Sequence, residues 1–183
     1  MRGSPVFCLL IEKTEVNHQL RDLKMQTHIT TEFAILAPVP IMHLESARKE
    51  GLTEAAFGVS ANVKKRLDNA DSLRGDAVVR VLIYASLEDE KPEYPCATWA
   101  GYYTGAETTD EQRPATTENS QGEDKEGWTS FWLVSCLTEL SEPVTIGKLG
   151  GRGKNTYYDK TFKPRSLMLI RYPADIEQFA MPG

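Results

Sequence analysis

The sequence predicts an α+β fold, a small mixed β-barrel of five to six strands with a few short helices. Two observations favour this class. Apolar runs of strand length recur along the chain and are separated by glycine and proline. Helical spacing of apolar residues is confined to two short segments early in the chain. The 183 residues, 40 % hydrophobic and 26 % charged, suffice for one globular domain with a core.

The first part of this domain predicts a strand, a helix, a second strand and a second helix. Residues 32–40 are an apolar run that ends in proline, which is typical of a buried strand. Residues 41–51 place apolar side chains at helical spacing and end in glycine. A brief strand is expected at 55–59. Ser60 then suits the N-cap of a helix over residues 61–70.

The second part predicts strands almost throughout. Residues 77–86 alternate in two apolar sets, as a strand between two layers does. Residues 96–107 form another strand, and residues 127–140 are apolar on both faces, which indicates cover on both sides. A short helix or turn is expected at 143–149. The last strand is predicted at 166–173.

The ends of the chain and the charge pattern suggest how the domain is organised. Residues 1–30 are predicted to form an N-terminal extension, and residues 31–183 are predicted to form one domain. Residues 107–126 hold seven acids and two bases and predict an acidic loop. Residues 145–166, here called the glycine-basic loop, hold six Lys/Arg against one Asp, which gives +5 in a chain of net charge −5. Such a local field decides which partner docks there.

Several classes of protein receive no support. No apolar run has the length of a membrane-spanning helix, and the apolar run at 5–11 is too short for a secretory signal. The chain therefore predicts a cytoplasmic protein that does not associate with membranes. The cysteines have no metal-ligand or disulfide spacing, and neither a metal nor another cofactor is expected. They are Cys8, Cys96 and Cys136.

The glycine-basic loop does not match a nucleotide-triphosphate motif. A phosphate-binding P-loop requires Ser or Thr after Gly-Lys, and here Asn155 follows Lys154. A dinucleotide motif would require glycine at Thr156. Two interpretations remain open. The cations and aromatic side chains contact phosphates and bases of a nucleic acid, or the loop is a solvated turn that balances the acidic loop.

Catalytic motifs are absent from the sequence. His43 is the histidine that a catalytic triad would have to use, but no nucleophile-elbow motif accompanies it. Enzymatic activity is left open and is not the favoured interpretation. The tryptophans are more informative, because Trp99, Trp128 and Trp132 lie on neighbouring predicted strands. They either pack in the core or wall a pocket for a flat ligand such as a base.

The order of short motifs resembles the PUA-like superfamily, in particular its EVE, ASCH and YTH branch. The matching stretches are FAILAPVP, GDAVVRVLIYAS, TWAGYYTG, FWLVSCLTELSEPVTIGKL and FKPRSLMLI, over about residues 32–172. This resemblance implies a small β-barrel that binds RNA or DNA, often with one modified base in an aromatic pocket. The acidic loop after TWAGYYTGAE departs from that pattern.

The leading hypothesis is therefore a nucleic-acid-binding module that recognises a modified base. The expected ligand contacts are Tyr84, Ser86, Trp99 and Trp128. The expected phosphate contacts are Lys148, Arg152, Lys154 and Arg165. Two alternatives stay open: a small enzyme or nucleotide-ligand sensor that uses the same pocket, and a protein-interaction module. The sequence does not distinguish RNA from DNA or define the oligomeric state.

Overall fold

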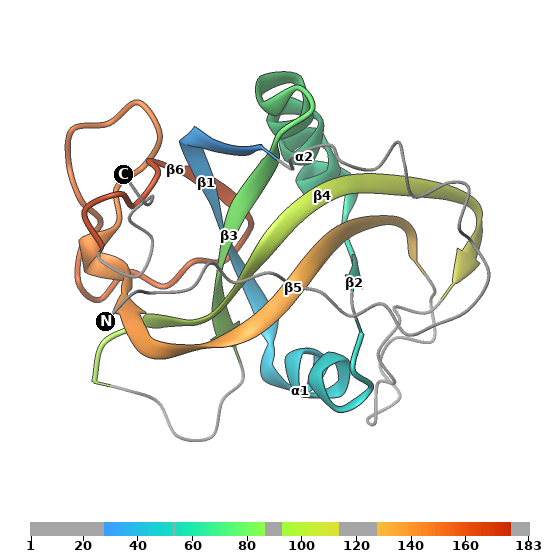
Figure 1. The fold of residues 1–183 in the computed structure, drawn as a ribbon, viewed down its shortest axis with the longest axis horizontal. Helices are drawn as coiled ribbons and strands as arrows, with labels where there is room; N and C mark the ends of the chain where they lie inside the picture. Colours follow the sequence, from blue (N-terminus) through green and yellow to red (C-terminus); the bar gives the residue numbers. More distant parts are fainter. Residues whose placement is uncertain (1–27, 53, 87–92, 114–127, 177–183) are drawn as a thin grey trace, which may run out of the picture.

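The computed structural model describes residues 28–52, 54–86, 93–113 and 128–176 (Figure 1). Within them the chain forms an α+β fold, which confirms the predicted class. The elements in chain order are β1 (Ile29–Pro40), α1 (Ile41–Lys49), β2 (Glu54–Gly58), α2 (Ala61–Arg74), β3 (Val78–Ser86), β4 (Cys96–Arg113), β5 (Trp128–Thr145), the 3-10 helix η1 (Ile146–Lys148) and β6 (Met168–Ile170).

The six strands form one mixed sheet in the order β2-β5-β4-β3-β1-β6. β1 and β3 are parallel, and the other neighbouring strands are antiparallel. The parallel pair requires a crossover, which α1, β2 and α2 provide. β2 and β6 are the two edges of this sheet among the described residues, so the closed barrel stays a prediction.

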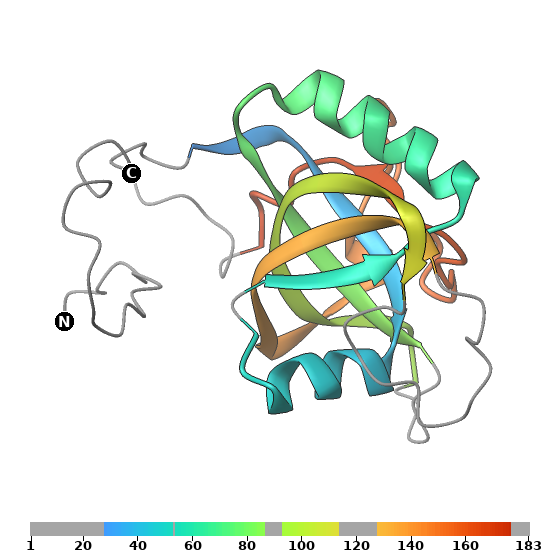
Figure 2. The ribbon, with the colours of Figure 1, turned by 90° about the vertical axis from the view of Figure 1, so that its right-hand side faces the viewer.

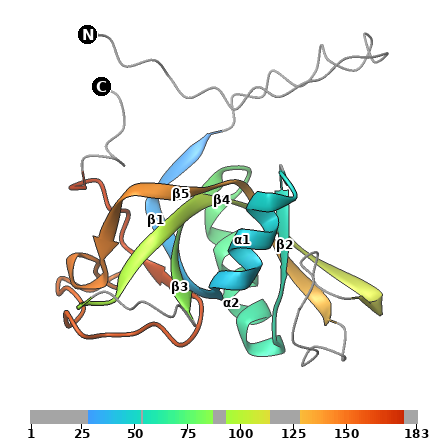
Figure 3. The ribbon, with the colours of Figure 1, turned by 90° about the horizontal axis from the view of Figure 1, so that it is seen from below.

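The sheet is buried on both faces, and β1 lies at its most buried part. Phe33, Ile35, Ala37 and Val39 of β1 belong to a first core cluster with residues of β3, β5 and both helices. The intervening Ala34 and Leu36 belong to a second cluster with Ile146, Leu149 and Ile170. Figure 2 shows the strands between α2 and α1, and Figure 3 shows both helices on one side of β1 and the segment after β5 on the other.

The hairpin of β4 and β5 is longer than the sequence predicts. Glu107 pairs with Phe131 and Thr108 with Ser130, so that residues 107–113 of the predicted acidic loop are strand. β5 pairs with this segment at Glu107, Thr108 and Arg113, and such pairing supplies backbone hydrogen-bond partners without requiring apolar side chains. The remaining part of the loop, 114–127, and residues 1–27 of the predicted extension lie outside the described residues.

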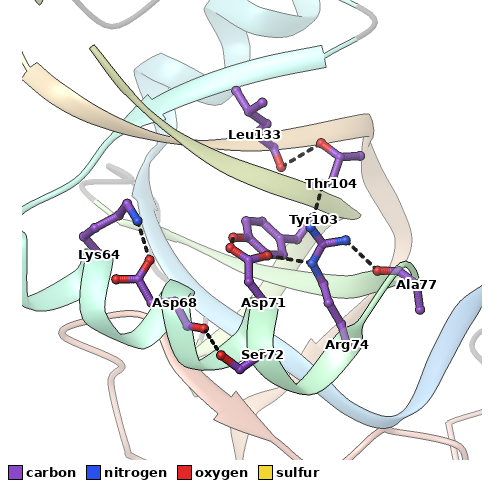
Figure 4. A network of polar contacts seen from close by, with 9 residues as sticks. All are labelled: Lys64, Asp68, Asp71, Ser72, Arg74, Ala77, Tyr103, Thr104 and Leu133. Carbon is purple, nitrogen blue, oxygen red and sulfur yellow. Dashed lines mark hydrogen bonds and ion pairs between the residues drawn. The ribbon is translucent and has the colours of Figure 1, made fainter. Parts of the chain in front are cut away.

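A polar network joins α2 to β4 and to Ala77, the residue before β3 (Figure 4). The buried Tyr103 hydroxyl donates to Asp71 Oδ2 at 2.9 Å, and Arg74 Nε donates to Asp71 Oδ1 at 2.7 Å. Arg74 also donates to the carbonyl oxygens of Ala77 at 2.7 Å and Thr104 at 3.0 Å. The network thus fixes the C-terminal end of α2 against the sheet.

Replacement of Asp71 by alanine should destabilise the protein by about 2–3 kcal/mol, because it leaves the buried Tyr103 hydroxyl without its acceptor and removes the carboxylate that pairs with Arg74. Asp68→Ala is the matched control. Asp68 pairs with Lys64 on the exposed side of the same helix, so its loss should cost about 1 kcal/mol or less. Urea unfolding measures both values, and equal losses would contradict the structural role of Asp71.

Alkaline pH should destabilise the protein through Tyr103. Burial, followed by the hydrogen bond to the Asp71 carboxylate, raises the pKa of Tyr103 well above its ordinary value of 10. Above pH 10 the unfolded chain therefore releases a proton that the folded protein keeps, and stability falls as pH rises. In Tyr103→Phe the slope of unfolding free energy between pH 10 and 11.5 should be shallower by up to about 1.4 kcal/mol per pH unit. An unchanged slope in urea titrations would contradict this assignment.

Candidate ligand-binding pocket

A cavity of about 400 Å³ opens where β1 and β2 end and β5 begins. Its walls are mainly apolar, with two tryptophans on one side. The apolar residues that line it include Pro38, Pro40, Phe57, Trp128, Trp132 and Leu167. The polar residues that line it are His43, Ser60, Arg165 and Ser166.

Both helices begin at this cavity, because each follows directly on a strand that ends there (Figure 2). Pro40 is the N-cap residue of α1 and Ser60 that of α2, and neither side chain caps its helix by a hydrogen bond. The first backbone N–H groups of a helix have no partner within it, and they give that end a partial positive charge. The cavity therefore combines apolar walls with an electropositive border.

The position of Trp128 depends on a glycine. A Cβ atom on Gly58 would lie 2.3–2.5 Å from three atoms of the Trp128 indole, so the ring rests directly on the Gly58 backbone. Trp132, four residues further along β5, is 3 % exposed and contacts the Phe57 ring at a centroid distance of 5.5 Å. Trp132 is thus both a core residue and the floor of the cavity, whereas Trp128 is half-buried at its rim.

The cavity carries positive charge. Arg165 is exposed at the rim, and the described residues that line the cavity include no carboxylate. Arg66 of α2 donates to the carbonyl oxygen of Leu167 at 2.6 Å, which ties the rim segment 165–167 to α2. An anionic group at Arg165 would therefore meet little local repulsion.

Only part of the predicted ligand set lies in the cavity. Trp128 lines it. Tyr84 and Ser86 pair in register with Pro38 and Pro40, next to the cavity, and do not line it. Trp99 is 2 % exposed in the first core cluster, below the guanidinium of Arg48 at 5.3 Å. The structure thus brings Tyr84 and Ser86 near the cavity and separates Trp99 from it.

The predicted phosphate contacts are also divided. Arg165 lies at the cavity, whereas Lys148, Arg152 and Lys154 are exposed elsewhere on the glycine-basic loop. Two aromatic residues of this loop face inward: Tyr158 stacks on Phe162 at 4.8 Å, and both pack against the second core cluster. Burial also raises the pKa of Tyr158. Part of the loop is therefore structural cover for the sheet.

The residues that β2 and the starts of the two helices contribute to the cavity were not predicted as site residues from the sequence. Phe57, Gly58 and Ser60 lie far from Trp128 along the chain, and they meet it only because β2 pairs antiparallel with β5, Gly58 beside Phe131. The helix-capping signal at Ser60 marks one border of the cavity. No pattern in the sequence indicates that the two helices begin at the same cavity.

No protein-family model matches the sequence, and no curated protein is similar to it. Within the described residues, no three His, Cys, Asp or Glu side chains gather closely enough to hold a metal ion. None of the described helices is long and apolar enough to cross a membrane.

Replacement of Gly58 by alanine should displace Trp128, because the new methyl group would occupy the place of the indole. In a ¹H–¹⁵N spectrum the Trp128 indole N–H resonance, assigned from Trp128→Phe, should shift in Gly58→Ala. Gly105→Ala is the matched control, since a Cβ atom there has its nearest contact at 3.7 Å. A Trp128 resonance that is unchanged in Gly58→Ala would disprove the packing of Trp128 on Gly58.

Proposed function

We propose that the protein is a PUA-like module that binds RNA or DNA and holds one base in the cavity beside Trp128. The observation that carries the proposal is the cavity itself, with its tryptophan side and the N-terminal ends of two helices at its border. Its volume of about 400 Å³ is within the usual range for small-ligand sites. The barrel closure implied by the sequence resemblance is part of this proposal.

A base is a suitable occupant for two reasons. Its flat face gains stacking energy on an indole, and Trp128 is half-buried at the rim, where a base leaving a strand would enter. Its polar edge requires hydrogen-bond partners in an otherwise apolar site, and Ser60, Ser166 and the first N–H groups of α2 lie at the cavity. A modified base would differ from an unmodified one in its fit to the cavity, because its added group would contact Pro38, Pro40 and Phe57.

The charge at the rim supports a nucleic acid over a neutral ligand. Arg165 is exposed, and the described lining residues include no carboxylate that would neutralise it. A phosphate next to the inserted base would replace counterions there, so binding should weaken with salt. Loss of Arg165 should reduce the slope of log affinity against log salt by about one unit.

Replacement of Trp128 by alanine should weaken oligonucleotide binding by about 1–3 kcal/mol, roughly 5- to 150-fold, with a smaller effect on folding. Trp99→Phe is the matched control, because Trp99 is buried away from the cavity. Its binding should equal that of the wild type. Fluorescence anisotropy on modified and unmodified RNA and DNA strands measures affinity, and thermal melting measures stability.

The outcomes separate the candidate functions. If free nucleotides bind as tightly as strands do, and if their affinity depends little on salt, the result would favour a nucleotide sensor. No binding of any nucleic acid by a folded protein would disprove the proposal and favour a protein-interaction module. An equal loss of binding in Trp99→Phe and Trp128→Ala would disprove the assignment of the cavity.

A further inference from the structure

A second cavity, of about 280 Å³, lies between the glycine-basic loop and the segment that follows β6. Its charged and aromatic lining residues are Lys148, Tyr157, Arg171, Tyr172 and Asp175. It shares no lining residue with the cavity at Trp128. Two cations against one carboxylate leave it with a positive charge.

The Arg171 guanidinium is held in place, and its buried Nε atom has no hydrogen-bond acceptor among the described residues. A Cβ atom on Gly150 would lie 2.5 and 2.7 Å from Arg171 Nη2 and Nε, so the guanidinium rests on the Gly150 backbone. Its other neighbour is the ring of Tyr157, at 5.0 Å. A fixed guanidinium with a buried, unpartnered Nε, beside a second cation and in a cavity of net positive charge, is a suitable site for an anion.

Tyr157 offers an apolar surface next to this charge. Tyr157 is 56 % exposed, and it is the only large hydrophobic residue that is exposed in the part of the chain that the structure describes. The Arg171 guanidinium lies over the ring, and more than half of the residue is open to solvent. A phosphate and an adjacent base would satisfy both features, the phosphate at Arg171 and Lys148 and the base on Tyr157.

The two cavities lie at opposite ends of β6. Leu167 lines the first and Arg171 the second, and four residues of extended chain span about 13 Å. Arg152 lies between them, because its N–H donates to the carbonyl oxygen of Leu169 at 3.2 Å and Gly151 pairs with Ile170. Arg165, Arg152 and Arg171 therefore follow one another along this edge of the sheet.

We propose that the cavity at Tyr157 and Arg171 is a second subsite for the same nucleic-acid strand, which runs along β6 and places a second nucleotide there. This inference rests on the proposed function, since the cavity at Trp128 holds the first base. It adds to that function a path for the strand along β6 and a minimum strand length for full affinity. Arg152 contacts the phosphates between the two subsites.

Unlabelled strands of one to eight nucleotides, as RNA and as DNA, test the second subsite by competing with a labelled eight-nucleotide strand. In the wild type, affinity should rise about tenfold in one step when a strand becomes long enough to reach both cavities. Tyr157→Ala should remove this step and leave single nucleotides unaffected. Lys148→Gln should reduce the salt slope by about one unit for the longer strands alone. Lys49→Gln, at the C-terminal end of α1, is the charge-matched control and should change neither.

The results distinguish the two proposals. Binding that requires Trp128 but has no length step, or a step that persists in Tyr157→Ala, would overturn the second subsite alone. Binding that requires Tyr157 but not Trp128 would overturn the proposed base pocket and leave the second cavity as an independent site. No binding of any strand would overturn both.

Discussion

The burial of β1 on both faces is the constraint on which the rest of the structure depends. Its side chains alternate between the two core clusters, with Phe33 and Ile35 on one side and Ala34 and Leu36 on the other. A strand of this kind is stable only where both layers are covered. The helices cover the first face. The chain after β5 must therefore cover the second, and it does so with Leu149, Tyr158 and Phe162.

This requirement explains why an acidic chain gathers cations, glycines and aromatic residues in one loop. The aromatic residues that point inward close the second core cluster. Gly150 allows the Arg171 guanidinium to lie against the backbone. The cations occupy the outer side, where Arg152 and Lys154 are exposed. One segment thus serves as core cover on its inner side and as a positive surface on its outer side.

The sequence predicted the individual helices and strands better than it predicted the contacts between them. Helix starts after Pro40 and Ser60 and the two-faced alternation of β3 are local signals, and all appear in the structure. The predicted length of the β4–β5 hairpin was wrong. Residues 107–113 carry no apolar pattern, and their strand conformation depends on pairing with β5. Trp128 is an expected ligand contact because it lies on one of the neighbouring predicted strands, which is a local property of the sequence. Its neighbours Phe57 and Gly58 come from β2, and no local pattern indicates that contact.

The charge distribution gives the proposed interface an orientation. A net charge of −5 repels a polyanion at long range, but at physiological salt this repulsion is screened beyond about 8 Å. Within that distance the nearest charges dominate. The edge that carries Arg165, Arg152 and Arg171 is therefore a surface on which a strand can approach closely, whereas the acidic residues of the β4–β5 hairpin disfavour contact there. An overall acidic composition is thus compatible with binding a nucleic acid, and it would select the orientation in which the strand meets β6.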